Sequence, residues 1–268
     1  MSILESAVLG AIQGVTEFLP ISSSGHLVIA EKLFGLNVDA LKSFDVALHA
    51  GTFFAIFIYF WKDILGMLKA FFGVFAGRLD TGNEYLKLIL YIVIGSIPAI
   101  LIGFKFGDYL DENFRNVHSV ALVLGGVGLL FLLAEYVNKK FKEKKGLNIW
   151  KALFIGVFQA TALVPGVSRS GSSISAGLFS KLSRESAARF SFLLGIPAIL
   201  GAAVLTGVKN YSEMILPVNL LPICVGFVTS LLFGLISVSV LMKFLKKHSL
   251  TIFAVYRLAV SACMLFFL

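Results

Sequence analysis

Two polar segments, each set inside an otherwise apolar stretch, carry the residue types that could do chemistry. In the first, Gln13 and Glu17 are four positions apart, so they lie on one face of a helix. A carboxylate at membrane depth is costly and usually faces a cavity or a charged partner. The run Ser-Ser-Ser-Gly-His over residues 22–26 follows directly. We therefore predict that Glu17 has a functional role, in preference to a simple interfacial position.

The serines of this run have two interpretations that are compatible with each other. A serine oxygen needs a base to become nucleophilic, and His26 is the type of residue that usually serves near neutral pH. Alternatively, the serines cap a returning helix that we expect to begin near Leu27. The free N–H groups of such a helix start also bind phosphate.

The second polar segment, Ser-Arg-Ser-Gly-Ser-Ser over residues 168–173, precedes another expected helix start. Arg169 carries a planar, permanently charged group that suits phosphate oxygens. Its alternative role is a structural salt bridge to Glu17. We predict anion binding for Arg169 in preference to a purely structural role.

Other polar residues in apolar windows give weaker signals. Asp45 opens an expected span, where complementing the helix dipole is as reasonable as a functional role. His49, Ser96 and Arg257 also lie in or near apolar windows, and for Arg257 we expect snorkelling or pairing rather than catalysis. The two cysteines, Cys224 and Cys263, have no partner at ligand spacing and are expected to be buried small hydrophobic residues.

The amino-acid composition indicates which class of protein contains these two polar segments. Of the 268 residues 58% are hydrophobic and only 14% are charged, whereas roughly a quarter are charged in a soluble domain. The net charge of +8 does not indicate nucleic-acid binding, because Lys and Arg occupy short loops and form no basic face with interleaved aromatic residues. We predict an all-α integral membrane protein.

Six windows are apolar over about 20 residues, the length that crosses a bilayer core; they lie near 44–62, 85–107, 117–137, 187–208, 217–243 and 250–267. An amphipathic piece, 64–76, is expected at the membrane interface. Two further stretches, 3–36 and 149–181, are interrupted at 20–26 and 165–173. Each interruption frees backbone groups that hydrocarbon cannot solvate, so we predict two re-entrant helix–loop–helix segments. The N-terminus lacks a basic leader region, so we expect the first apolar segment to stay in the mature protein.

The two interrupted stretches resemble each other at a constant offset of 146 positions, which pairs Gly10 with Gly156, Gln13 with Gln159, Ser22 with Ser168, Ser24 with Ser170, Gly25 with Gly171, Phe44 with Phe190, and Leu48 with Leu194. This similarity predicts an internal repeat within one membrane domain, about 1–145 and 146–268. In each half, a re-entrant segment returns to its own side of the membrane and three full spans cross to the other side. The second half therefore starts on the opposite face and is inverted, so the two polar loops enter from opposite leaflets. Their tips should meet near the midplane, with Glu17 and Arg169 in one pocket.

The Lys and Arg residues predict the orientation. Apart from Arg169 and Arg257, the 23 Lys and Arg residues divide unequally between the two faces. The N-terminal face receives five (Lys32, Lys42, Lys105, Arg115 and Lys209) and the opposite face receives the other sixteen. The positive-inside rule places the opposite face in the cytoplasm, so both termini are expected outside it.

The segment from Gln13 to His26, QGVTEFLPISSSGH, resembles the first signature of bacterial undecaprenyl pyrophosphate phosphatases, the bacitracin-resistance family. The segment PGVSRSG, residues 165–171, is similar to the second signature. Order, spacing and total length agree, so the resemblance covers the whole chain.

This resemblance implies a bacterial inner-membrane enzyme that hydrolyses undecaprenyl pyrophosphate to undecaprenyl phosphate and inorganic phosphate, with magnesium or calcium as cofactor. The family's catalytic residues fall on Glu17, Ser23, His26 and Arg169, and the expected metal ligands are Glu17 and, more weakly because it is uncharged, Gln13. The resemblance also favours a site that opens to the outer face. The other polar residues of the two motifs are expected to bind substrate: Gln13, Ser22, Ser24, Gly25, Ser168, Ser170, Gly171 and Ser172.

As a hypothesis, Ser23 attacks the terminal phosphorus while His26 takes its proton, and a direct attack by water stays open. The rival function is a polyprenyl-phosphate flippase or transporter, since inverted repeats with broken helices are a transporter architecture. The expected partners are undecaprenyl pyrophosphate and membrane lipids, and no nucleic acid. A homodimer is compatible with these features, and the sequence leaves the oligomeric state open.

Overall fold

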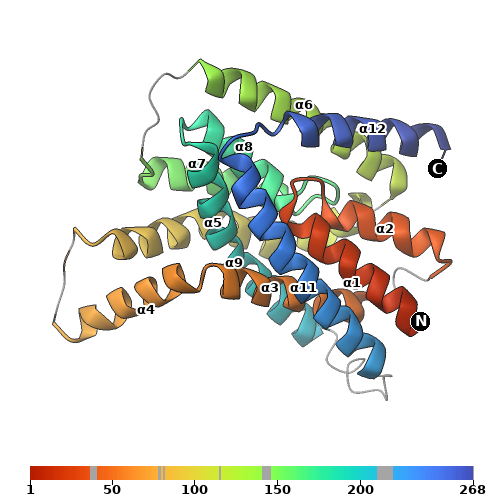
Figure 1. Cartoon of the computed structure of the whole chain (residues 1–268), viewed down its shortest axis with the longest axis horizontal. Helices are drawn as coiled ribbons and strands as arrows, with labels where there is room; N and C mark the ends of the chain where they lie inside the picture. The colour runs from red at the N-terminus through yellow and green to blue at the C-terminus, as the bar shows by residue number, and fades with distance from the viewer. Residues whose placement is uncertain are drawn as a thin grey trace.

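The computed structural model describes residues 1–36, 41–77, 80, 82–114, 116–140, 146–209 and 220–267, and every regular element in these ranges is a helix (Figure 1). The helices are α1 (Ile3–Phe18), α2 (Ser23–Leu33), α3 (Lys42–Tyr59), α4 (Trp61–Phe75), α5 (Glu84–Phe114), α6 (Val117–Lys139), α7 (Ile149–Thr161), α8 (Arg169–Phe179), α9 (Arg184–Lys209), α11 (Leu220–Leu245) and α12 (Thr251–Phe267).

Among the residues that the structure describes, three helices are long and apolar enough to cross a membrane unaided. They are the Glu84–Gly107 part of α5, then α6, and then α11, which begins at Leu220. These helices match the expected windows 85–107, 117–137 and 217–243, as far as the last is described. Their outward faces carry large exposed side chains, such as Phe104 at 88% exposure, which is the pattern that a lipid-facing helix requires.

The other expected spans take less regular forms. The window 44–62 is not one straight helix, because α3 ends at Tyr59 and the chain bends by 76° into α4. The expected interfacial piece, 64–76, lies in α4 up to Phe75, and Ala76 is the C-cap of that helix. The window 187–208 lies in α9, which contains Pro197, and the last window forms the 17-residue α12. The expectation that Cys224 and Cys263 are buried is wrong: both are exposed on the outside of apolar helices.

The two interrupted stretches both form helical hairpins, α1–α2 and α7–α8. Each hairpin packs its first helix along a long helix from the other part of the chain: α1 lies along α11, and α7 lies along α5 (Figure 1). Both contacts depend on glycine. A Cβ on Gly10 would come within 2.5 Å of the Gly226 carbonyl oxygen, and one on Gly156 would clash with the Gly95 carbonyl oxygen and lie 2.7 Å from the Gly95 Cα.

The core between the hairpins brings their ends together. α3 packs on α11 and α9, and α6 packs on α12 and α8. At the junction, Phe18 at the end of α1 meets Phe192 of α9 edge to face, with ring centroids 5.6 Å apart. Both rings are fully buried, so an apolar contact between α1 and α9 lies directly before the first hairpin turn.

Candidate active site

The two hairpin turns share one backbone design. Ser22 and Ser168 both adopt positive φ, 77° and 73°, and both cap the helix that follows. The Ser22 hydroxyl accepts from the Gly25 N–H, and the Ser168 hydroxyl from the Gly171 N–H, each at 3.3 Å. The expected capping role of serine is therefore confirmed. The returning helix begins at Ser23 rather than near Leu27, because this cap lets Gly25 and His26 join the first helical turn.

The turns also touch one another. The Gly166 N–H donates to the Ser24 hydroxyl at 3.5 Å, and the Ser170 hydroxyl donates to the Glu17 carbonyl oxygen at 3.4 Å. At the second turn only glycine fits at position 171, because a Cβ there would clash with the Phe131 ring. The starts of α2 and α8 are thus brought to one place, where the backbone N–H groups of both first turns lack helical acceptors.

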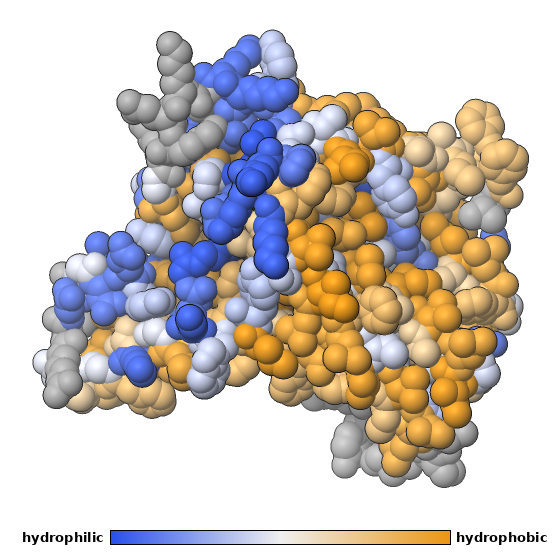
Figure 2. All heavy atoms as spheres, in the orientation of Figure 1, coloured by the Kyte–Doolittle hydropathy of each residue, from blue (hydrophilic) through white to orange (hydrophobic). Residues whose placement is uncertain are grey.

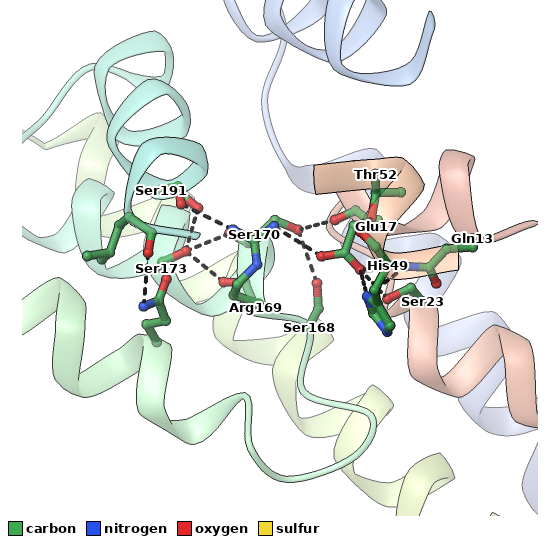
Figure 3. A network of polar contacts seen from close by, with 12 residues as sticks. Gln13, Glu17, Ser23, His49, Thr52, Ser168, Arg169, Ser170, Ser173 and Ser191 are labelled. Carbon is green, nitrogen blue, oxygen red and sulfur yellow. Dashed lines mark hydrogen bonds and ion pairs between the residues drawn. The ribbon is translucent and has the colours of Figure 1, made fainter. Parts of the chain in front are cut away.

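Glu17 lies at the centre of the polar network (Figure 3). Its Oε2 accepts from the Ser23 hydroxyl at 2.7 Å and from the Gln13 amide at 3.2 Å. Its Oε1 accepts from the Arg169 guanidinium at 3.1 Å. His49 of α3 completes the surroundings, with its Nδ1 3.0 Å from the Gln13 amide nitrogen and 3.8 Å from the Glu17 carboxylate.

Arg169 confirms the predicted proximity of the two loops. It is 152 positions from Glu17 in sequence, yet the two side chains form an ion pair. Its Nη1 also donates to the Ser191 carbonyl oxygen of α9 at 3.2 Å. Gly195 leaves room for the guanidinium, since a Cβ there would clash with Nη1. The ion pair is the structural role considered for Arg169, and it holds the guanidinium at the point where the helix starts meet.

His26 does not contact Ser23 as the serine–histidine hypothesis requires. Its Nδ1 donates to the Ser22 carbonyl oxygen at 2.7 Å, and its Nε2 lies 2.8 Å from the Tyr256 hydroxyl of α12. In a neutral ring, Nε2 is then the acceptor and is occupied by Tyr256. The group in position to take the Ser23 proton is Glu17.

The remaining motif serines bond mainly to the turns themselves. Ser172 donates to the Arg169 carbonyl oxygen at 3.2 Å, and Ser173 pairs with Ser191 at 2.5 Å. Ser168 and Ser170 lie 3.3 Å apart, as do Ser22 and Ser24. Their contacts are those of residues that shape the two turns, and their predicted contact with substrate stays a prediction.

Residues outside the two motifs also take part. His49 and Arg257 were visible in the sequence as polar residues within apolar windows, but Tyr256 and Ser191 gave no such signal. Arg257 neither snorkels nor forms an ion pair within the described part of the chain: it is fully buried and binds backbone carbonyl groups. Asp45 lies in the first turn of α3, where its charge complements the helix dipole.

The site suits a cation only together with an anionic ligand. Within the described ranges, no three His, Cys, Asp or Glu residues gather at metal-binding distance. Beside Glu17, however, the Gln13 Oε1 is buried and has no hydrogen-bond partner. One carboxylate and one amide oxygen are few ligands for a divalent cation, but magnesium is often held by one or two carboxylates plus substrate phosphates.

The arrangement combines the parts that phosphoryl transfer needs. It has a hydroxyl bonded to a carboxylate, a planar guanidinium, and two helix starts in turns that touch one another.

The chain also resembles known proteins over almost its whole length. A family model described as "Bacitracin resistance protein BacA" matches residues 6–263. Among curated proteins, the "Undecaprenyl-diphosphatase" of Rubrobacter xylanophilus is 40% identical over 263 residues, which are 98% of this chain and 97% of that protein. The "Undecaprenyl-diphosphatase" of Trichlorobacter lovleyi is 42% identical over 97% of this chain and 94% of its own, and that of Caldicellulosiruptor bescii is 38% identical over 100% and 98%.

Proposed function

The chain belongs to the bacitracin resistance protein BacA family, and on this premise we propose that it hydrolyses undecaprenyl pyrophosphate to undecaprenyl phosphate and inorganic phosphate. This reaction returns a lipid carrier to cell-wall synthesis and underlies bacitracin resistance. The observation that carries the proposal is the placement of Glu17, which binds the Ser23 hydroxyl at 2.7 Å and Arg169 at 3.1 Å.

Substrate binding begins with a change of partner at Arg169. The terminal phosphate offers oxygens that match the guanidinium better than the single bond to Glu17 does. As Arg169 turns to the phosphate, Glu17 loses its positive partner and becomes a stronger base. The free N–H groups at the starts of α2 and α8 take further phosphate oxygens. The polyprenyl tail stays among the apolar helices and the surrounding lipid.

The chemical step then uses groups that are already in contact. The Ser23 oxygen attacks the terminal phosphorus while its proton passes to Glu17. The bond between that phosphorus and the bridging oxygen breaks, and undecaprenyl phosphate leaves with the bridging oxygen. Glu17 passes this proton to the bridging oxygen of the leaving group and is again a carboxylate. Water then attacks the phosphoserine while Glu17 takes a proton from it, the bond between phosphorus and the Ser23 oxygen breaks, that oxygen receives the proton back from Glu17, and inorganic phosphate departs. In the alternative, Glu17 activates water directly and no phosphoserine forms.

The metal cofactor, magnesium or calcium, is also a proposal. Glu17 and the Gln13 Oε1 would hold it together with pyrophosphate oxygens. When bound, such an ion neutralises charge on the phosphate groups. Because the protein contributes one carboxylate, we expect the ion to arrive with the substrate rather than to reside in the empty enzyme.

The architecture around the site completes the proposal. We propose six spans and two re-entrant hairpins, arranged as inverted halves of about 1–145 and 146–268. The equivalent Ser22 and Ser168 caps support the repeat, as does the packing of each hairpin on a long helix from the other half. The protein is multi-pass, and we propose the bacterial inner membrane, a site open to the outer face, and a homodimer as the assembly to test first.

A lipid flippase is the rival, because opposed hairpins that meet at mid-membrane also suit a transporter. A carrier needs an anion site but not a nucleophile. The Ser23–Glu17 contact is therefore better explained by the enzyme.

The decisive experiment is phosphate release by the purified protein from undecaprenyl pyrophosphate, with and without a chelator. We expect steady release that the chelator reduces and that excess magnesium or calcium restores. Transport of labelled lipid across vesicles without phosphate release would instead favour the flippase. Release that is unchanged by the chelator would contradict the metal proposal alone.

A further inference from the structure

Arg257 of α12 is a buried cation that the proposed mechanism does not use. It is the largest of the fully buried side chains in the described part of the molecule. A guanidinium withdrawn from water is unfavourable unless other groups replace its solvation. Its partners therefore indicate what the residue is for.

These partners are three backbone carbonyl oxygens from separate elements. Nε donates to Leu124 of α6 at 3.1 Å, Nη1 to Pro20 at 3.4 Å, and Nη2 to Gly166 at 2.8 Å. The guanidinium also lies 5.3 Å from the centre of the Phe131 ring. Each partner is neutral, and no described carboxylate lies within ion-pair distance of Arg257. Among the described residues, Arg257 is thus a buried positive charge whose hydrogen-bond partners are all neutral.

Pro20 and Gly166 belong to the two hairpin turns. Pro20 lies between Glu17 and Ser23, and Gly166 lies three residues before Arg169. A single planar group bonded to both carbonyl oxygens fixes the two turns relative to one another. The preceding residue, Tyr256, makes the contact with His26, so one turn of α12 supports the site at two points.

We propose that Arg257 is a positioning residue with two effects on the phosphatase site: it holds the two turns in register, and its charge leaves the empty site net positive. Glu17 and Arg169 neutralise each other, so the charge of Arg257 remains to attract an anionic pyrophosphate. The inference rests on the proposed function for the effect on turnover. The charge effect concerns pyrophosphate binding and stands separately.

Two substitutions separate the effects. Arg257→Lys keeps the charge but loses the planar fork, so we expect kcat to fall about a hundredfold, as small misplacements of reacting groups do, while inorganic pyrophosphate still binds within about threefold of wild type. Arg257→Gln removes the charge as well, so we expect pyrophosphate binding to weaken about tenfold or more. Binding is measured by calorimetry with inorganic pyrophosphate, and kcat and KM with undecaprenyl pyrophosphate.

Arg184→Gln is the matched control. Arg184 donates to the buried Glu135 carboxylate at 2.8 Å, and this pair does not involve the two hairpin turns. The substitution should lower the unfolding temperature but leave kcat and pyrophosphate binding unchanged. Equal pyrophosphate affinity in Arg257→Gln and wild type would overturn the proposed charge effect. A normal kcat in Arg257→Lys would overturn the proposal that Arg257 holds the two turns in register. If Arg257→Gln does not fold, a tenfold loss of affinity in Arg257→Lys overturns the charge effect. Wild type that binds pyrophosphate but releases no phosphate would refute the proposed function and not the charge effect.

Discussion

At the scale of single residues, the site depends on charges that are stable only together. Glu17 and Arg169 are both nearly buried, and either charge alone would be unfavourable at this depth. Their pairing makes the empty site stable, and it also gives the substrate a partner to displace. The Ser23 hydroxyl is already bonded to the carboxylate that this displacement would free.

Substitution of Ser23 tests this arrangement. Ser23→Ala should lower kcat at least about a hundredfold, because the group acts in the chemical step, and should change KM little. Ser6→Ala is the control, since the buried Ser6 hydroxyl bonds the Ser2 carbonyl oxygen at the start of α1, outside both motifs. Steady-state phosphate release from both variants gives the answer. A Ser23→Ala enzyme that retains near-normal turnover would make water the attacking group.

The sequence allowed part of this site to be predicted. Glu17, Ser23 and Arg169 are polar residues at places where an apolar segment breaks, and a repeat that inverts brings such breaks together. The partner of His26 could not be predicted. Tyr256 is 230 positions away and lies in an unremarkable apolar window, so its position follows only from how α12 packs on α6.

At the scale of helices, glycine decides how the hairpins are held. α1 and α7 approach neighbouring helices so closely that their backbones touch, through Gly10 and Gly156 respectively. In lipid, where apolar attraction between helices is weak, close backbone packing is a main source of association. The repeat in sequence predicted that these glycines are equivalent, but not that α11 and α5 are their partners.

The Gly156 contact gives a stability prediction. Gly156→Val should destabilise the protein by about 1–3 kcal/mol, as overpacking does, because the new side chain would meet the backbone of Gly95. Gly126→Val is the matched control, since Gly126 is an exposed helical glycine with no atom within 4 Å of an added Cβ. Unfolding temperatures in one detergent compare the two variants. Equal losses would mean that helix propensity, and not the α5–α7 contact, sets the effect.

At the scale of the whole molecule, polar and apolar residues occupy different sides of the face shown in Figure 2. Hydrophilic residues gather on the left of this face, where α4 and α7 lie in Figure 1, and hydrophobic residues cover the right. Both termini lie at the right of Figure 1, far from the outer end of α4. This arrangement supports the orientation proposed from the charges, with the Lys-rich ends on one side of the membrane and the two termini on the other.

The orientation can be tested with a pair of matched cysteines. Lys32 follows α1 and lies near the end of α2, whereas Lys140 caps the end of α6, and both are exposed. The positive-inside rule places Lys140 in the cytoplasm and Lys32 outside it. In a background with Cys224→Ser and Cys263→Ser, a membrane-impermeant maleimide added to intact cells should label Lys32→Cys and not Lys140→Cys. Both variants should react once the membrane is opened, which controls for accessibility. The reverse pattern in intact cells would invert the topology and would place the N-terminal face, with both termini, in the cytoplasm.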